Sequence, residues 1–476
     1  MGKNIMKKRL FAIIILSVYV VTMLFHVYKP LPKNISYESP VYRVSEDQVS
    51  FYYNLTGNKE RKKEFTEQTF QRTLEIIDEA EQFIVLDFFL FNSYHEKKKE
   101  FPEISKKLTE ALIDKKRTNP DIEIIFISDE VNTSYNSHST PEFEKLKKNG
   151  VEVILTNVEP LRDSMPIYNA IWRMFFQWFG DEGKGWLPNG LVETAPDMTV
   201  RSYLKLFNVK ANHRKTITTE KTTLISSGNP HDASAYFANT AYEVKEALVN
   251  DLLISEKAAA DTRRDIAFPD PIKQKTGKGD VQVQLLTEGK IQKALRQEIT
   301  EAKKGEEIWI TMFYLADRDI IDSLTKAANS GVQINIILDT NKNSFGKKKT
   351  GLPNIPMSEE LIEDSKGKIN IRWFAPMPEQ FHTKMMYVKK KNSGVIISGS
   401  ANYTSRNLNN FNLETNVKIK GPHSTRAIKE TEQYFHKMWK NHGAEYTTSY
   451  KEHDEKTAGI KRGVYTLQKL LHLTTY

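Results

Sequence analysis

The sequence predicts an α/β fold built from two similar halves, preceded by a helix that spans a membrane. Three observations lead to this prediction: an apolar run near the N-terminus, a series of alternating helices and strands that occurs twice, and a His-x-Lys motif at the same point of each copy. Helices that alternate with β-branched strands are typical of α/β units on largely parallel sheets. A chain of 476 residues also has room for more than one domain.

The apolar run covers residues 10–28 and follows a basic flank. That flank contains Lys3, Lys7, Lys8 and Arg9. The run is close to the roughly 20 residues that a spanning helix needs. A cleaved signal peptide is the alternative, but its apolar region is usually about 7 to 15 residues long and ends at a small-x-small site. We therefore expect residues 1–30 to form a single-pass anchor in the cell membrane, with the basic flank in the cytoplasm and the rest of the chain extracytoplasmic, or secreted if the anchor is cleaved.

Each copy predicts the same order of elements: a helix, a strand, a second helix and two further strands. In the first copy these are residues 66–81, 83–90, 104–115, 122–129 and 151–155. In the second copy they are residues 290–304, 308–314, 319–328, 332–339 and 369–374. The second and third strands of each copy lie at matching positions, so the sequence predicts an internal duplication.

A stretch with two prolines and a run of Lys and Gly separates the copies and suggests a linker. We expect a first half at residues 31–265, the linker at 266–279 and a second half at 280–476. The first half also contains an inserted aromatic segment, residues 160–204, that has no counterpart in the second half.

Chemistry-bearing residues occur in the same order in both copies. The first copy contains His213, Lys215, Ser227, Asn229 and Glu243, and the second contains His382, Lys384, Ser400, Asn402 and Glu414. On a strand a His-x-Lys pair directs both side chains to one face, because alternate residues point the same way. Two such sets that met at a pseudo-twofold axis would surround a phosphate with imidazoles, ammonium groups and amides. A single histidine is more often structural, so the repetition carries this interpretation.

These residues resemble the motif of the phospholipase D superfamily, which reads His-x-Lys-x4-Asp followed by Gly-Ser-x-Asn or a close variant. The resemblance covers essentially everything after the anchor. It implies two similar phospholipase D-type α/β halves packed around one shared active site. It also places six residues on catalytic positions, namely His213, Lys215, Asn229, His382, Lys384 and Asn402.

Three positions depart from the family pattern. Glu220 and Lys389 replace the motif aspartate, and Ser226 replaces the glycine before the first serine. None of these changes removes a His, Lys or Asn. We expect Glu243 and Glu414 to accept a ring N–H and orient each histidine, with surface glutamates as the alternative.

The resemblance implies a phosphodiesterase that needs no metal and no cofactor. One histidine attacks phosphorus to form a phosphohistidine, and the other protonates the leaving oxygen. We expect His213 to be the nucleophile and His382 the acid and base, because the N-terminal copy usually supplies the nucleophile in this family. The lysines and asparagines would hold the non-bridging oxygens. Without cysteines, the chain has neither disulfides nor a thiol nucleophile.

Two substrate classes remain open. The anchor and the aromatic insertion favour a phospholipid at a membrane surface, cleaved by water to phosphatidic acid or transferred to an alcohol as in cardiolipin synthesis. A membrane-tethered nuclease acting on single-stranded nucleic acid is the alternative, supported by the net charge of +9 and by the lysine runs at residues 347–349 and 389–391. The aromatic helix expected at residues 167–179 also fits a simple core helix.

Overall fold

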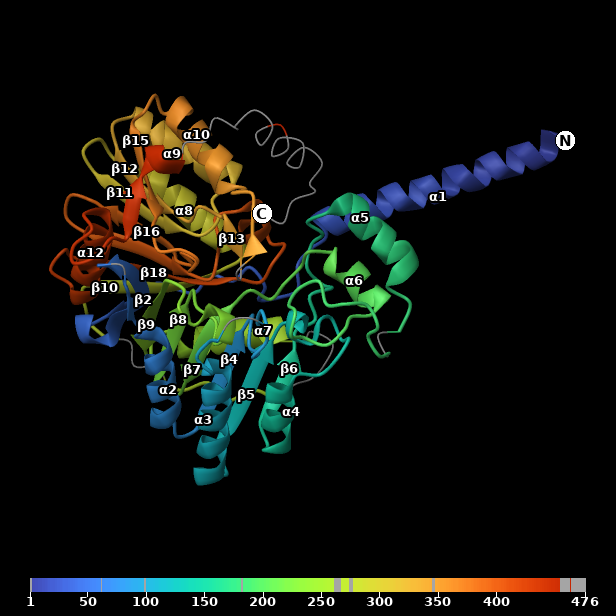
Figure 1. Ribbon diagram of the computed structural model, residues 1–476, viewed down its shortest axis with the longest axis horizontal. Helices are drawn as coiled ribbons and strands as arrows, with labels where there is room; N and C mark the ends of the chain where they lie inside the picture. The colour runs from blue at the N-terminus through green and yellow to red at the C-terminus, as the bar shows by residue number, and fades with distance from the viewer. Residues whose placement is uncertain are drawn as a thin grey trace.

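The computed structural model describes residues 2–60, 62–97, 100–180, 183–260, 267–273, 277–344, 347–453 and 463. Two mixed sheets lie face to face, and helices cover the outer face of each (Figure 1). This confirms the α/β class and the arrangement in two halves.

The first half contains an eight-stranded sheet in the order β3-β2-β9-β8-β7-β4-β5-β6. Its strands are β2 (Val49–Lys59), β3 (Lys62–Thr66), β4 (Phe83–Phe88), β5 (Glu123–Ser128), β6 (Glu152–Leu155), β7 (Lys215–Thr219), β8 (Thr222–Ser226) and β9 (Asn239–Lys245). The outer helices are α2 (Thr69–Glu79), α3 (Ile104–Thr118) and α4 (Pro141–Lys148). β4, β5 and β6 run parallel, whereas the other neighbouring pairs are antiparallel.

The second half contains a nine-stranded sheet in the order β1-β10-β18-β17-β16-β11-β12-β15-β19. Its strands are β1 (Tyr42–Val44), β10 (Val281–Thr287), β11 (Glu307–Met312), β12 (Gln333–Leu338), β15 (Ile369–Phe374), β16 (Lys384–Lys389), β17 (Gly394–Gly399), β18 (Thr415–Gly421) and β19 (Thr447–Ser449). The helices of this half are α8 (Gly289–Glu301), α9 (Arg318–Asn329), α10 (Asn354–Asp364), α11 (Ser405–Leu408) and α12 (Arg426–Trp439). Two short strands, β13 (Asn343–Ser344) and β14 (Lys347–Lys348), pair antiparallel apart from the main sheet.

The central strands are apolar on both faces because they lie between two cores. In β11, Ile308 and Ile310 pack under the outer helices, whereas Trp309 points into the cluster between the two sheets. This alternation follows from the period of two in a strand. Phe51 of β2, stacked on Tyr242 with ring centroids 4.9 Å apart, belongs to the same central cluster. The two halves therefore share one buried interface.

The N-terminal segment after the anchor does not stay with the first half. β1 pairs antiparallel with β10 at the edge of the second sheet, in the register Tyr42↔Val283 and Val44↔Val281. Ser39 N also donates to Leu285 O at 3.1 Å. A boundary at residue 31 would assign these residues to the first half, but their backbone pairing belongs to the second.

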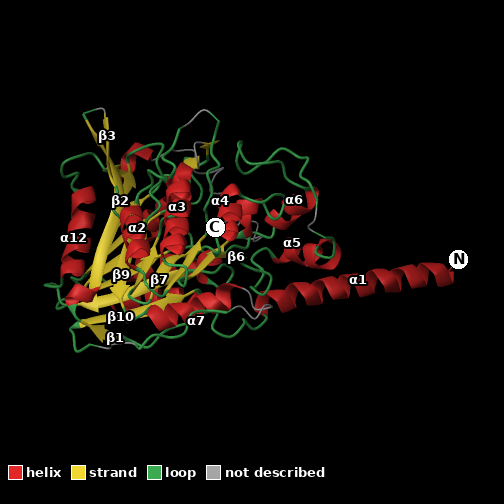
Figure 2. Cartoon of the chain, turned by 90° about the horizontal axis from the view of Figure 1, so that it is seen from below, coloured by secondary structure: helices red, strands yellow, loops and turns green. Residues whose placement is uncertain are grey.

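The inserted segment forms a separate helical layer beside the first sheet. It contains α5 (Pro166–Ile171), a π-helical turn (Trp172–Phe176) and α6 (Val200–Leu206). α1 (Gly2–Tyr28) projects away from the body, and its base packs against α5 in both views (Figures 1 and 2). α1 is long and apolar enough to cross a membrane. α7 (Val249–Ala260) is the last helix described before the expected linker. The expected boundary at residues 265 and 266, and residues 274–276 of the expected linker, lie outside the described residues.

Candidate active site

Both motif histidines lie in the extended segment just before a central strand. We expected each His-x-Lys pair on a strand, but β7 begins at Lys215 and β16 begins at Lys384. Each lysine Nζ donates back to the carbonyl oxygen of its own histidine, at 2.6 Å to His213 and 2.7 Å to His382. All four side chains are buried. Each pair still brings its ammonium group and its imidazole into the same buried site.

The surroundings of the two pairs match residue by residue. The Phe89 ring lies 4.9 Å from the His213 ring, and Lys215 Nζ lies 5.2 Å from the Phe89 centroid. In the second half Phe313 lies 5.1 Å from His382 and 5.3 Å from the nitrogen of its lysine. Local geometry therefore repeats together with the sequence.

The aspartates that end the second strand of each half hold the motif backbone. Asp129 Oδ2 accepts from Asn212 N and Asp339 Oδ2 accepts from Phe381 N, each at 2.7 Å. Burial raises the pKa of Asp129 to about 7 and that of Asp339 to about 6. These acceptors fix the segment that carries each histidine.

Each histidine is oriented by a residue from the opposite half. His213 Nδ1 lies 3.0 Å from Glu414 Oε1, and His382 Nδ1 lies 3.1 Å from Asn239 Oδ1. With Nδ1–H donated to these acceptors, Nε2 of each ring is left to face a ligand. One histidine thus meets a carboxylate and the other a neutral amide.

The prediction that Glu243 orients a histidine is wrong. Its carboxylate accepts from Arg72 Nε at 2.9 Å, from Tyr52 Oη at 3.0 Å and from Thr222 Oγ1 at 2.9 Å. Asn239 holds His382 instead. Glu414 does contact a histidine, but the contact is with His213 of the other half rather than with its own motif.

Both motif serines support these orienting residues. Ser227 Oγ donates to Asn239 Oδ1 at 3.1 Å and accepts from Thr240 N at 2.9 Å. Ser400 Oγ donates to Glu414 Oε2 and accepts from Thr415 N at 2.9 Å. Each serine therefore positions the residue that accepts from a histidine, Asn239 for Ser227 and Glu414 for Ser400.

The two motif asparagines differ in their contacts. Asn229 Oδ1 accepts from Leu90 N at 3.1 Å, which turns its carbonyl toward the backbone after β4. Among the described residues the buried Asn402 Oδ1 has no hydrogen-bond partner. The amide of Asn402 is therefore not held in the way that the amide of Asn229 is.

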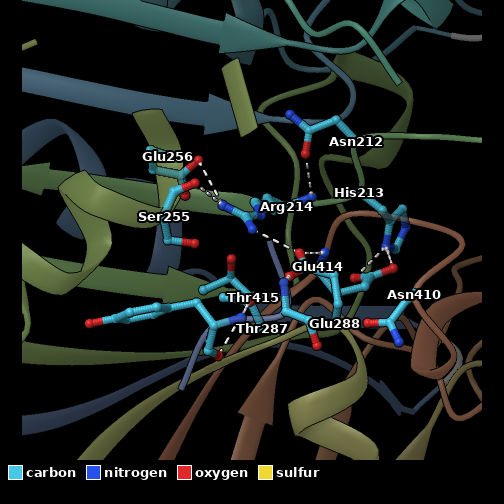
Figure 3. Close-up of polar contacts among 12 residues, drawn as sticks. Asn212, His213, Arg214, Ser255, Glu256, Thr287, Glu288, Asn410, Glu414 and Thr415 are labelled. Atoms are coloured by element: carbon cyan, nitrogen blue, oxygen red, sulfur yellow. Dashed lines mark hydrogen bonds and ion pairs between the residues drawn. The ribbon is translucent and has the colours of Figure 1, made fainter. Parts of the chain in front are cut away.

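A buried ion-pair network, which the sequence did not reveal, links the two halves beneath His213 (Figure 3). Arg214 lies between the motif residues, and its guanidinium contacts Glu288 Oε1 at 2.7 Å and Glu256 Oε2 at 3.3 Å. Glu288 Oε1 also accepts from Glu414 N at 3.0 Å. Arg214 is thereby joined to the residue that orients His213.

Basic groups are concentrated in this buried site. Burial lowers the pKa of Lys215 to about 7 and, together with the charge of Lys215, lowers the pKa of Lys384 well below its usual value. Burial and the two ammonium groups also lower the pKa of His213 and His382. Burial raises the pKa of Glu414 to about 7, although Lys215 opposes this rise. Without a bound anion the site favours neutral groups.

The departures from the family motif have structural explanations. Glu220 accepts from the backbone of Glu81 at 2.8 Å and of Gln82 at 3.1 Å, which fixes the turn before β4. Lys389 pairs with Glu432 at 2.6 Å. A Cβ on Gly399 would lie 2.2 Å from Thr415 O, so only the second copy requires the glycine.

Two cavities of about 280 and 290 Å³ flank the first-half side of the site. The first is mainly apolar, is lined by residues of α2, α3, β7 and β8, and reaches Lys215, Asn229 and Asn239. The second lies between residues 89–96 and the inserted loop 189–195.

Comparisons with known proteins bear on the family of the second half and on the fold. Residues 295–439 match the family model described as "Cardiolipin synthase, PLD-like domain". This match relates most of the second half to phospholipase D-like domains. A search of curated protein sequences gives no match.

A likeness in fold to a solved structure extends over most of the chain. The chain resembles the crystal structure of phosphatidylserine synthase from Haemophilus influenzae Rd KW20, with a TM-score of 0.60, 12% identity and coverage of 91% of this chain and 96% of that chain. Two weaker likenesses are polyphosphate kinase from Porphyromonas gingivalis (TM-score 0.45, 14% identity, 90% and 53% covered) and the phospholipase D family member Nuc from Salmonella typhimurium (TM-score 0.28, 18% identity, 36% and 98% covered).

Proposed function

We propose that this protein is a membrane-anchored phosphodiesterase that cleaves or transfers the phosphatidyl group of phospholipids through a phosphohistidine. The observation that carries the proposal is the convergence of two His-x-Lys pairs, each held by an acceptor from the opposite half. Two lysines, two imidazoles and two amides form a compact site for one phosphodiester anion.

In the proposed first step, Nε2 of His213 attacks phosphorus, the P–N bond forms and the bond to the leaving oxygen breaks. His382, protonated on Nε2, gives its proton to that oxygen. In the second step a water or alcohol gives a proton to His382 and attacks phosphorus, and the P–N bond breaks. Lys215, Lys384, Asn229 and Asn402 hold the non-bridging oxygens in both steps.

The asymmetry of the two acceptors supports His213 as the nucleophile. The phosphorylated imidazole with Nδ1–H is cationic, and the Glu414 carboxylate at 3.0 Å stabilises that charge. The group that meets Nδ1 of His382 is the neutral Asn239, which keeps His382 a stronger acid toward a poor alkoxide leaving group.

A phospholipid suits this chain better than a nucleic acid. The base of α1 packs on the aromatic insertion, whose loop 189–195 forms a wall of the second cavity. The cations expected to bind nucleic acid are partly neutralised, since Lys389 pairs with Glu432 and Lys390 pairs with Glu298, both at 2.6 Å. We place the catalytic part on the extracytoplasmic side, following the basic flank before α1.

The test uses the full chain in vesicles that contain phosphatidylglycerol and phosphatidylcholine, with a single-stranded oligonucleotide in a parallel reaction, all in chelator. We expect phosphatidic acid or cardiolipin as product, and a loss of about 10²-fold to 10⁴-fold in His213→Ala and His382→Ala. Glu414→Gln should lose activity, whereas Glu243→Gln, a matched glutamate bound to Arg72, should retain it. Cleavage of the oligonucleotide with intact lipids would refute the lipid assignment and establish a nuclease.

A further inference from the structure

The packing of α1 on the insertion constrains how deep the protein sits in a membrane. Residues 10–18 are exposed all round the helix, whereas one face becomes half-buried from Tyr19 to Val27. Within this contact Tyr19 Oη donates to Ile167 O at 2.9 Å, and Asp163 N donates to His26 O at 3.0 Å. The rest of the protein therefore packs against the last third of α1.

The unpacked part of the apolar run is too short to cross a bilayer. Residues 10–18 rise about 14 Å at 1.5 Å per residue, whereas the hydrocarbon core is about 30 Å thick. The full run, residues 10–28, rises about 28 Å and does match that thickness. If α1 spans, the segment from Tyr19 onward lies in hydrocarbon, and so does whatever packs on it.

The insertion that makes this contact also exposes several apolar side chains. Outside α1, eleven large hydrophobic side chains are exposed among the described residues, and six of them lie in the 45-residue insertion. They are Ile167 (46% exposed), Phe175 (52%), Trp178 (76%), Phe179 (66%), Trp186 (68%) and Val200 (46%). An exposed apolar cluster of this kind usually marks a protein or membrane contact.

Several polar side chains of this stretch have partners within the protein, although Trp172 Nε1 has none among the described residues. Between residues 164 and 180 the only charged side chain is Arg173, which is buried and forms two hydrogen bonds of 2.8 Å with Asp163. Trp178 Nε1 donates to Met174 O at 3.2 Å, and Gln177 Nε2 donates to Arg173 O at 2.6 Å. Hydrocarbon tolerates a segment only when its hydrogen-bonding groups are paired internally.

We propose that α5 and the π-helical turn are embedded in the outer leaflet beside α1, with Phe175, Trp178 and Phe179 in contact with lipid. This inference rests on the spanning anchor of the proposed function and adds a second, non-spanning membrane element. It brings the cavity walled by residues 189–195 to the leaflet surface. The substrate class that this arrangement serves is a lipid resident in that same leaflet.

The chain has no cysteine, so single cysteines can carry an environment-sensitive fluorophore without background labelling. Three variants of the full chain are reconstituted in phosphatidylglycerol and phosphatidylcholine vesicles. Leu16→Cys (62% exposed) reports on the anchor, Phe179→Cys on the insertion, and Met377→Cys (40% exposed) on an exposed apolar side chain of the second half. Each is quenched separately by brominated lipid and by aqueous iodide.

We expect the labels at positions 16 and 179 to lose most of their emission with brominated lipid and little with iodide, and the label at 377 to behave in the opposite way. A label at 179 that iodide quenches while the label at 16 stays protected would overturn the embedded insertion and leave the anchor intact. A label at 16 that iodide quenches would overturn the anchor and the insertion together.

Discussion

The two histidines differ in the group that meets Nδ1, a carboxylate for His213 and an amide for His382. The sequence alone found both motifs because the series repeats, but it assigned Glu243 by counting from Asn229 and so chose the wrong residue. The better signal is the threonine that follows each acceptor, Thr240 after Asn239 and Thr415 after Glu414, because its N–H binds the motif serine. Each acceptor binds the histidine of the opposite half. This pairing depends on how the two halves pack, which no local sequence pattern encodes.

At this scale we predict a shifted pH profile for Asn239→Asp. A carboxylate 3.1 Å from Nδ1 favours the imidazolium, so the pKa of His382 rises by about 1 unit or more. If His382 is the acid, the alkaline limb of kcat/KM moves to higher pH by that amount. Asn239→Ala, which removes the acceptor without adding charge, should lower the rate without this upward movement. An unchanged alkaline limb in Asn239→Asp would rule out His382 as the acid.

At the scale of elements, the alternation of helices and strands in both copies is confirmed to within about three residues at most ends. The expected helix at 66–81 is α2 at Thr69–Glu79, and the strand at 369–374 is β15 with the same bounds. The insertion was harder to predict, because the single helix expected at 167–179 is α5 followed by a π-helical turn. Periodicity detects an apolar face but not a change in helical pitch, nor the pairing of β1 with the distant β10.

The ion pairs of Arg214 connect several elements, and they lead to a prediction for Arg214→Met. Arg214 precedes β7 and pairs with Glu256 of α7 and with Glu288 before α8. Its loss leaves two buried carboxylates without their cation, which should reduce the free energy of unfolding by about 3–5 kcal/mol. Denaturant unfolding of the full chain in detergent measures this.

Arg296→Met is the control for that experiment. Arg296 pairs with Asp319 at 3.2 Å, but both side chains are about half exposed, so the change should stay below about 1 kcal/mol. Equal losses in the two variants would contradict a structural role for the buried network.

For the whole molecule, the meeting of the halves concentrates cations that neither half holds alone. Burial in one site lowers the pKa of Lys215 to about 7 and also lowers the pKa of Lys384. The charge of each lysine in turn lowers the pKa of both histidines. The duplication and the resemblance led to a shared site, but these shifts depend on the depth of burial at the interface. A sequence pattern carries no measure of that depth.

This charge concentration predicts that anion binding takes up protons. At pH 8 Lys215 is mostly neutral in the empty site, and a bound phosphate raises its pKa, so binding should consume about one proton. Calorimetry of inorganic phosphate in two buffers with different ionisation enthalpies measures the uptake, and affinity should fall as the pH rises above 7. A heat that does not depend on the buffer would contradict the depressed pKa.

The central claim is that both halves make one phosphotransfer site with His213 as the nucleophile, and trapping the covalent intermediate tests it most directly. The full chain is mixed with phospholipid labelled with ³²P in the phosphodiester, quenched in alkali, digested and mapped by peptide. We expect acid-labile label on the peptide that contains His213, and none in His213→Ala. Label on the His382 peptide, or turnover without a labelled histidine, would contradict the account.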